Sequence, residues 1–241
     1  MKQWGLYALN GGKKAGINVR IAHAHNTRLI RDYKWPLKIF CKQFLNKSAT
    51  NIWGCGRDAG IYFFGKDNWN KSGMIMRNAI ELDRFEFNET IRNQIREANG
   101  VMIGEGELEE DMKKKASELG ITDKTLFTGL QSNVHEWYQA IDLFIMPSLF
   151  EGLPVVGIEA QATGLPALFS DAVTDEIVLS DNADRISLNE SNKQWAKKME
   201  RMLANAKSRS QGTQIVREAG YDIVTESKRI QDLYLKMCNE G

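Results

Sequence analysis

Cysteine, histidine and long apolar runs are all scarce in this chain of 241 residues. The three cysteines, Cys41, Cys55 and Cys238, are odd in number, far apart and without the spacing of metal ligands, as is typical of a reduced, cytosolic protein. No apolar run is long enough to cross a bilayer. The opening residues also lack the apolar core and cleavage site of a secretory signal, so the sequence predicts a cytoplasmic location.

The three histidines are not expected to bind a metal. His23 and His25 stand two positions apart near a short predicted strand, but no third ligand follows at a suitable spacing. His135 falls in a predicted helix, where we expect it to be exposed to solvent. The sequence also contains no repeats, no low-complexity tract and no recognised nucleic-acid-binding motif.

The net charge of +1 conceals two halves of opposite sign. Residues 1–100 carry 17 Lys and Arg against 8 Asp and Glu, whereas residues 101–241 carry 15 against 23. Such an asymmetry predicts two lobes with different partners. The basic half is suited to an anionic membrane surface or an anionic substrate. The alternative is that two solvated faces of opposite charge attract each other.

Strand-like and helix-like segments alternate along the chain, which predicts an α/β fold with parallel strands. The expected strands are residues 18–24, 74–76, 101–103, 126–129, 143–146 and 167–170. The expected helices are residues 28–47, 89–98, 109–119, 134–140, 154–163, 193–206 and 221–238. Residues 51–73 form a polar, glycine-rich stretch to which we assign no element.

Residues 28–47 combine six Lys and Arg with many apolar and aromatic residues, as in an amphipathic helix interrupted near Pro36. Such a helix can lie on a membrane surface. Ordinary core packing with a solvated face is the alternative, and we favour it.

The most informative segment is Pro147–Pro166, which carries two acids, Glu151 and Glu159, eight positions apart. An apolar run precedes it and another begins at its end, which predicts a strand, an acid-bearing loop, a helix and a second strand. Ligands of open α/β sheets bind where such loops leave the carboxyl ends of strands. The amides of Gly152 and Leu153 stand at the positive end of the helix, which suits a diphosphate, and a carboxylate within the helix can accept from ribose hydroxyls.

The segment FEGLPVVGIEAQATGLP resembles the Glu-x7-Glu motif of retaining, two-lobed glycosyltransferases of the GT-B fold, namely glycosyltransferase family 4. Val101–Leu108 and Phe127–Val134 are similar to donor-lobe segments of this family, Arg20–Asn26 to its acceptor-lobe strand and Asn78–Phe85 to its hinge. The resemblance covers nearly the whole chain and is strongest to bacterial enzymes that build capsular or extracellular polysaccharide. It implies two Rossmann-like lobes.

The resemblance also implies roles for individual residues. Glu151 would contact the donor sugar near the reacting centre, and His25 would line the donor-sugar site from the other lobe. By pattern alone, His25 is instead a structural histidine that caps a strand end. Glu159 would hold the ribose hydroxyls. The remaining implied donor-binding residues are Gly152, Leu153, Gly104 and Gly129.

Two parts of the family pattern are absent, so we expect both lobes to be incomplete. The opening strand and glycine-rich loop of the acceptor lobe are missing. Near residues 99–100 the chain lacks a strand–helix–strand unit, which needs about 30 residues, and the cations that neutralise the donor diphosphate. The expected units are a partial acceptor-binding lobe at 1–80, a nucleotide-sugar-binding lobe at 81–218 with this internal deletion, and a helix at 219–241 that packs back toward the first lobe.

The expected function is transfer of a sugar from a UDP-sugar to a glycan or lipid-linked acceptor, with retention of anomeric configuration and without a metal or other cofactor. The main alternative is a catalytically inactive remnant that binds a nucleotide-sugar or pairs with an active relative. A nucleotide-sugar epimerase is a third reading. The implied location is the cytoplasm, with a peripheral contact at the inner face of the membrane.

Overall fold

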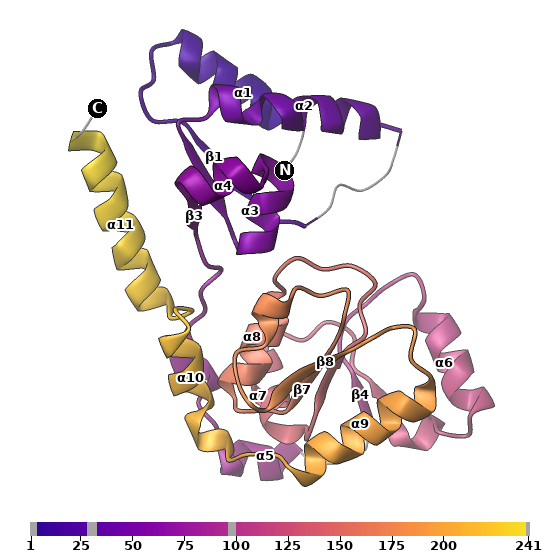
Figure 1. The fold of residues 1–241 in the computed structure, drawn as a ribbon. Helices are drawn as coiled ribbons and strands as arrows, with labels where there is room; N and C mark the ends of the chain where they lie inside the picture. The colour runs from indigo at the N-terminus through magenta and orange to yellow at the C-terminus, as the bar shows by residue number, and fades with distance from the viewer. Residues whose placement is uncertain (1–3, 28–32, 96–99, 240–241) are drawn as a thin grey trace.

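The computed structural model describes residues 4–27, 33–95 and 100–239, which form two lobes (Figure 1). The amino-terminal lobe lies at the top of Figure 1 and the carboxyl-terminal lobe below it. The parts of the expected helices at 28–32 and 96–98, and residue 99 of the expected deletion, lie outside the described residues.

The amino-terminal lobe is built on a parallel three-stranded sheet in the order β1-β2-β3. Its strands are β1 (Ile21–Ala24), β2 (Asn51–Gly54) and β3 (Gly73–Ile75). Its helices are α1 (Trp4–Lys14), α2 (Trp35–Ser48), α3 (Arg57–Phe64) and α4 (Lys66–Ser72). Buried Trp69 fills the space left by two glycines, because a Cβ on Gly60 or Gly73 would lie 2.2 or 2.3 Å from its ring.

The carboxyl-terminal lobe contains two parallel sheets, and no strand pairing joins them in the described part of the chain. The smaller sheet pairs β4 (Gly100–Met102) with β5 (Thr125–Phe127). The larger has the order β6-β7-β8, with β6 (Phe144–Met146), β7 (Ala167–Ser170) and β8 (Ala183–Ile186).

Short and medium helices cover these sheets. The α-helices are α5 (Glu89–Ile95), α6 (Glu109–Glu118), α7 (Val134–Ala140), α8 (Val155–Ala162), α9 (Asn192–Ala204) and α10 (Gly212–Glu218). The 3-10 helices are η1 (Leu82–Phe85), η2 (Thr122–Lys124), η3 (Asp175–Ile177) and η4 (Arg209–Gln211).

The centre of the larger sheet is fully buried. All four residues of β7 are inaccessible to solvent, and Ile158 of α8 packs in the same core. A parallel strand covered on both faces reads as a continuous apolar run. This explains why the limits of β7 agree with the sequence-based expectation, and it gives the acid-bearing loop a rigid support.

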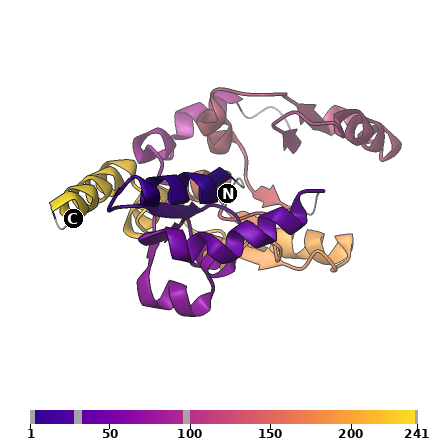
Figure 2. The ribbon, with the colours of Figure 1, turned by 90° about the horizontal axis from the view of Figure 1, so that it is seen from above.

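The chain passes between the lobes twice, and the two passages are hydrogen-bonded to each other. Ile80 donates to the carbonyl of Tyr221 at 2.9 Å and accepts from the amide of Ile223 at 3.0 Å. From there α11 (Ile223–Asn239) extends along the amino-terminal lobe, as Figures 1 and 2 show. Tyr234 of this helix packs against Trp53 of β2, with ring centroids 5.6 Å apart.

Several expectations about secondary structure are wrong. Residues 51–73 contain β2, α3 and α4, because their glycines serve close packing instead of a loop. Pro36 lies in the first turn of α2, where proline is tolerated because helical N–H groups are unpaired. The strand β8 and the helix α10 were not expected, since the ADRI sequence of β8 has no apolar run.

Candidate active site

The loop between β6 and α8 is tied to the sheet at its carboxyl edge. Ser170, at the end of β7, donates to the carbonyl of Ser148 at 2.5 Å. The Ser148 hydroxyl donates in turn to Glu151 Oε1 at 3.4 Å. Pro154 is the residue before the helix rather than its first residue, and no side chain caps the amino end of α8.

Glu159 lies within α8, and its carboxylate is hydrogen-bonded to a side chain of α7. Tyr138 Oη donates to Glu159 Oε2 at 3.2 Å. Burial raises the pKa of Glu159, while the Tyr138 hydrogen bond and the charge of Arg84 oppose the rise. Arg84 Nη2 lies 3.3 Å from His135 Nδ1. His135 is thus half-buried and engaged, contrary to our expectation, because it packs against Phe85 of η1.

The two lobes meet at the acid-bearing loop. Gly152 approaches the other lobe so closely that a Cβ there would lie 2.7 Å from the carbonyl oxygen of His25. Thr27 Oγ1 donates to the carbonyl of Glu151 at 3.1 Å. The Cys55 thiol donates to the same His25 carbonyl at 3.3 Å. The structure therefore brings His25, Glu151 and Gly152 to one place between the lobes.

The backbone amide of Leu153, before the start of α8, is hydrogen-bonded to the Cys55 thiol in this arrangement. Burial raises the pKa of the Cys55 thiol, and a hydrogen bond with the backbone of Leu153 opposes the rise. Leu153 itself is buried, whereas Gly152 is half-buried and lies close to the His25 carbonyl. A group of the amino-terminal lobe therefore occupies the amide of Leu153.

His25 and His23 form a neutral pair of rings at neutral pH. Their centroids lie 4.1 Å apart. Burial lowers the pKa of both imidazoles, that of His23 to about 4, where the charge of His25 adds to the effect. A neutral imidazole can bind a sugar hydroxyl but brings no positive charge to a diphosphate. Buried His23 Nε2 has no hydrogen-bond partner among the described residues.

Gly104 and Gly129 are brought together at the carboxyl ends of β4 and β5. The amide of Gly104 donates to the carbonyl of Gly129 at 2.9 Å. Both residues have positive φ, 130° and 62°, which disfavours any side chain. These two glycines follow the strands of the smaller sheet, whereas Glu151 and Glu159 lie in the segment between β6 and β7 of the larger sheet.

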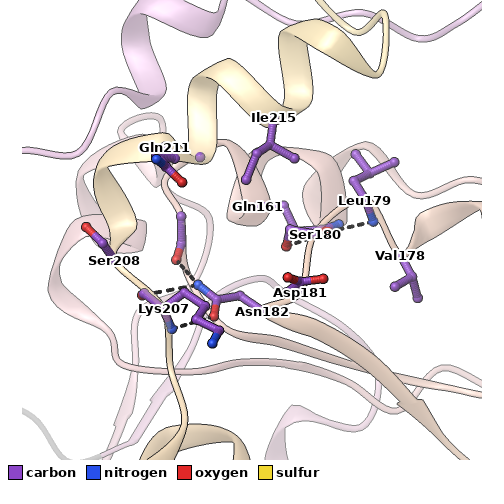
Figure 3. Close-up of a pocket in the computed structure, with 12 residues that line it drawn as sticks. Gln161, Val178, Leu179, Ser180, Asp181, Asn182, Lys207, Ser208, Gln211 and Ile215 are labelled. Carbon is purple, nitrogen blue, oxygen red and sulfur yellow. Dashed lines mark hydrogen bonds between the residues drawn. The ribbon is translucent and has the colours of Figure 1, made fainter.

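A pocket of about 420 Å³ lies at the opposite, amino-terminal edge of the larger sheet (Figure 3). None of the residues expected to bind a donor lines it. Asn182 spans its floor, donating to the carbonyl of Gly164 at 3.2 Å and accepting from the amide of Lys207 at 2.7 Å. Gln161 bonds both the amide of Leu179 and the carbonyl of Ile177. These polar groups serve the fold.

Two residues of the site were missed. Tyr138 looked like an ordinary helix residue, and Glu176 followed Thr174 in what reads only as a short helical turn. The sequence TDE is compatible with a capping Thr, and Thr174 does cap η3. Glu176 accepts from the amides of Arg57 and Asp58 in the amino-terminal lobe, a contact that nothing in the sequence indicates.

The described residues 4–27, 33–95 and 100–239 contain no group of three His, Cys, Asp or Glu side chains placed to hold a metal ion. Within the same ranges, every helix is too short or too polar to cross a membrane.

Several known proteins are similar to this chain in sequence. EpsF of Bacillus subtilis (strain 168), named as a glycosyltransferase, is 28% identical over 266 positions, covering 91% of this chain and 69% of EpsF. The UDP-Gal:alpha-D-GlcNAc-diphosphoundecaprenol alpha-1,3-galactosyltransferase of Escherichia coli is 29% identical over 151 residues, which cover 60% of this chain and 38% of that enzyme.

Solved structures give the same fold. HepE of Anabaena in complex with UDP has a TM-score of 0.82 at 14% identity, covering 98% of this chain and 77% of HepE. WaaG, a glycosyltransferase involved in lipopolysaccharide biosynthesis, has a TM-score of 0.64 at 15% identity over 92% of this chain and 80% of WaaG. The fold is therefore the α/β GT-B fold with parallel sheets. The family model described as glycosyl transferases group 1 matches residues 86–219, so the chain belongs to this family.

Proposed function

We propose that this chain is a retaining glycosyltransferase of family 4 that transfers a sugar from a UDP-sugar to a glycan or lipid-linked acceptor in polysaccharide biosynthesis. The observation that carries the proposal is the unit with Glu151 and Glu159, which lies inside the matched region, at the carboxyl edge of a parallel sheet and against the other lobe. HepE structures with UDP and UDP-glucose, and the UDP-Gal in the name of the Escherichia coli relative, support the choice of UDP.

In the proposed reaction, an acceptor hydroxyl oxygen forms a bond to the anomeric carbon while the bond from that carbon to the diphosphate breaks. Attack from the face that the diphosphate leaves retains the configuration, and a phosphate oxygen takes the acceptor proton. Negative charge develops on the departing diphosphate, which the amides of Gly152 and Leu153 would stabilise. Glu151 would position the sugar, Glu159 would accept from the ribose, and neutral His25 would bind a sugar hydroxyl. We propose no metal in this scheme.

The test is release of UDP from a panel of UDP-sugars, with and without a lipid-linked acceptor, followed by nuclear magnetic resonance of the product's anomeric centre. If the bond from the anomeric carbon to the diphosphate is axial in the donor, we expect the new glycosidic bond of the product to be axial as well. Glu151→Ala should lower kcat by about 100-fold, the effect typical of losing one group that stabilises the transition state. Exposed Glu190→Ala is the matched control. Turnover that needs added Mg²⁺ would contradict the metal-independent scheme, and an inverted product would contradict retention.

A second candidate is a non-catalytic subunit that binds a nucleotide-sugar or an active relative. The alignment with EpsF supports it, because 266 positions exceed the roughly 219 residues that 91% of this chain supplies, so about 47 positions have no counterpart here. The two sheets of the carboxyl-terminal lobe are also unpaired with each other in the described residues. This candidate predicts binding of UDP by calorimetry without release of UDP from any UDP-sugar. Turnover in the same assay would exclude it.

We further propose that the protein is cytoplasmic and touches the inner face of the membrane through α2. Leu37 and Phe40 of α2 are 42% and 56% exposed and, three positions apart, share one side of the helix. Tyr33, just before the helix, is 86% exposed. No acidic residue occurs in α2, and the half of the chain that contains it is basic, which complements anionic lipids.

The test of this contact is co-sedimentation with vesicles of phosphatidylglycerol and phosphatidylcholine. Wild-type protein should bind the anionic vesicles, and the pair Leu37→Glu and Phe40→Glu should abolish binding. Leu203→Glu on α9, which changes another exposed leucine, is the control. Equal binding to purely zwitterionic vesicles would refute the charge argument.

A further inference from the structure

The amino end of α3 is occupied by a carboxylate from the other lobe. Glu176 belongs to η3, which follows β7 in the carboxyl-terminal lobe. Its Oε2 accepts from the amide of Arg57 at 2.7 Å and its Oε1 from the amide of Asp58 at 3.0 Å. The amino end of a helix presents unpaired N–H groups and partial positive charge, so it binds anions. Here Glu176 supplies the anion.

A third hydrogen bond joins the same two segments, and here the carboxyl-terminal lobe supplies the donor. Thr174 Oγ1 donates to Asp58 Oδ2 at 2.8 Å, so each lobe contributes one carboxylate to the other. Thr174 is also the residue that caps η3, because its side chain accepts from the amide of Glu176. The position of Glu176 is therefore set by its own turn as well as by α3.

Gly56 makes room for this carboxylate. A Cβ at that position would lie 2.9 Å from Glu176 Oε1 and 3.0 Å from Oε2. The backbone of Gly56 is extended, with φ −156°, a conformation that any residue adopts. The absence of a side chain at Gly56 is thus required by the approach of Glu176 and not by the backbone.

We infer that Glu176 is a positioning residue that holds the two lobes together in the arrangement described here, and that its release from α3 opens the donor site. The same arrangement places the His25 carbonyl close to Gly152 and hydrogen-bonds the Cys55 thiol to the backbone of Leu153, so the Leu153 amide becomes available to a donor only after the arrangement is released. The interlobe contact rests on geometry alone, whereas its effect on turnover rests on the proposed function.

The contact is tested by hydrogen exchange and small-angle X-ray scattering on Glu176→Ala. Loss of a charge-assisted hydrogen bond should speed exchange at the amides of Arg57 and Asp58 by about tenfold or more. It should also increase the radius of gyration. Neighbouring Asp175→Asn, an exposed carboxylate of the same turn, is the control and should change neither. Unchanged exchange and unchanged radius in Glu176→Ala would overturn the inference.

Gly56→Ala gives an independent test that keeps the carboxylate. Because its backbone is unstrained, the added methyl group should act by displacing Glu176, and it should reproduce the faster exchange at α3. The Gly56→Ala variant exchanging like wild type would contradict the inference. Circular dichroism establishes that each variant is folded before its result is used.

The kinetic consequence separates positioning from general stability. The described arrangement occupies the Leu153 amide that would bind the donor, so its loss in Glu176→Ala should lower the KM for UDP-sugar while kcat stays unchanged. An unchanged KM in Glu176→Ala, or an equal fall of KM in Asp175→Asn, would overturn the positioning role. If neither the wild-type protein nor any variant turns over a UDP-sugar, the proposed function is wrong. The hydrogen-exchange and scattering results still decide whether the interlobe contact exists.

Discussion

Replacing Tyr138 by Phe removes one hydroxyl from a buried residue and tests how Glu159 is held. Tyr138 is 3% exposed, and its Oη lies 3.2 Å from Glu159 Oε2. A hydrogen bond to a charged group contributes about 1.5–3 kcal/mol. Glu159 is only half-buried, so screening by solvent places the expected loss at the lower end, about 1–2 kcal/mol at pH 7.5.

The stability lost in Tyr138→Phe should depend on pH, and the pKa of Glu159 sets the direction of this dependence. A carboxyl whose pKa is raised on folding stabilises the folded state below its unfolded-state pKa, and that contribution is lost as the pH rises through the folded-state pKa. Burial raises the pKa of Glu159, and the Tyr138 hydrogen bond opposes this rise. Removing the hydroxyl therefore raises the pKa further. The deficit of Tyr138→Phe should be largest at pH 7.5 and should shrink as acidification protonates Glu159.

Urea unfolding at pH 7.5 and near pH 4.5, each in a wild-type and a Glu159→Gln background, measures the effect. In the Glu159→Gln background, Tyr138→Phe should cost less, because the partner is no longer charged. Tyr138 Oη also lies 3.3 Å from the carbonyl of Val156. An equal cost in both backgrounds, or at both pH values, would show that the hydroxyl donates to Val156 and would refute the reasoning.

Three further outcomes are expected. Glu159→Ala should weaken UDP binding about tenfold by calorimetry, and unchanged affinity in a folded variant would exclude the ribose role. Gly164→Ala should lower the free energy of unfolding by about 2 kcal/mol or more, since φ is +68° and the new Cβ would lie 2.2 Å from the carbonyl oxygen of Arg209. Gly11→Ala, whose Cβ meets nothing, is the control. Arg209→Met should cost about 3 kcal/mol in urea unfolding, because this side chain donates to carbonyls at the ends of α7 and α8.

The elements around the acid pair were predictable from the sequence because their signals are local. The buried run of β7 and the stop at Gly164, which has φ +68°, mark strand and helix without reference to distant residues. The motif containing Glu151 and Glu159 lies on these elements. Its place at the carboxyl edge of the sheet then follows from parallel topology.

What could not be predicted depends on contacts between segments far apart in the chain. Gly60 reads as a loop residue, yet it lies in α3 because Trp69 needs its space. Glu176 contacts α3 across 118 residues of sequence, and the close approach of the His25 carbonyl to Gly152 joins residues of two lobes. Periodicity and capping patterns describe one element at a time, so they carry no information on how the lobes meet.

The paired passages between the lobes restrict how the molecule can move. The amide and the carbonyl of Ile80 are both hydrogen-bonded to the second passage of the chain, at Tyr221 and Ile223. The lobes are therefore joined by two connected segments at one place and not by a single flexible link. A double connection resists sliding and twisting apart but permits rotation about its own line. Opening should therefore follow one angular coordinate, with displacement growing in proportion to distance from Ile80, and every ligand that enters must be admitted by that single rotation.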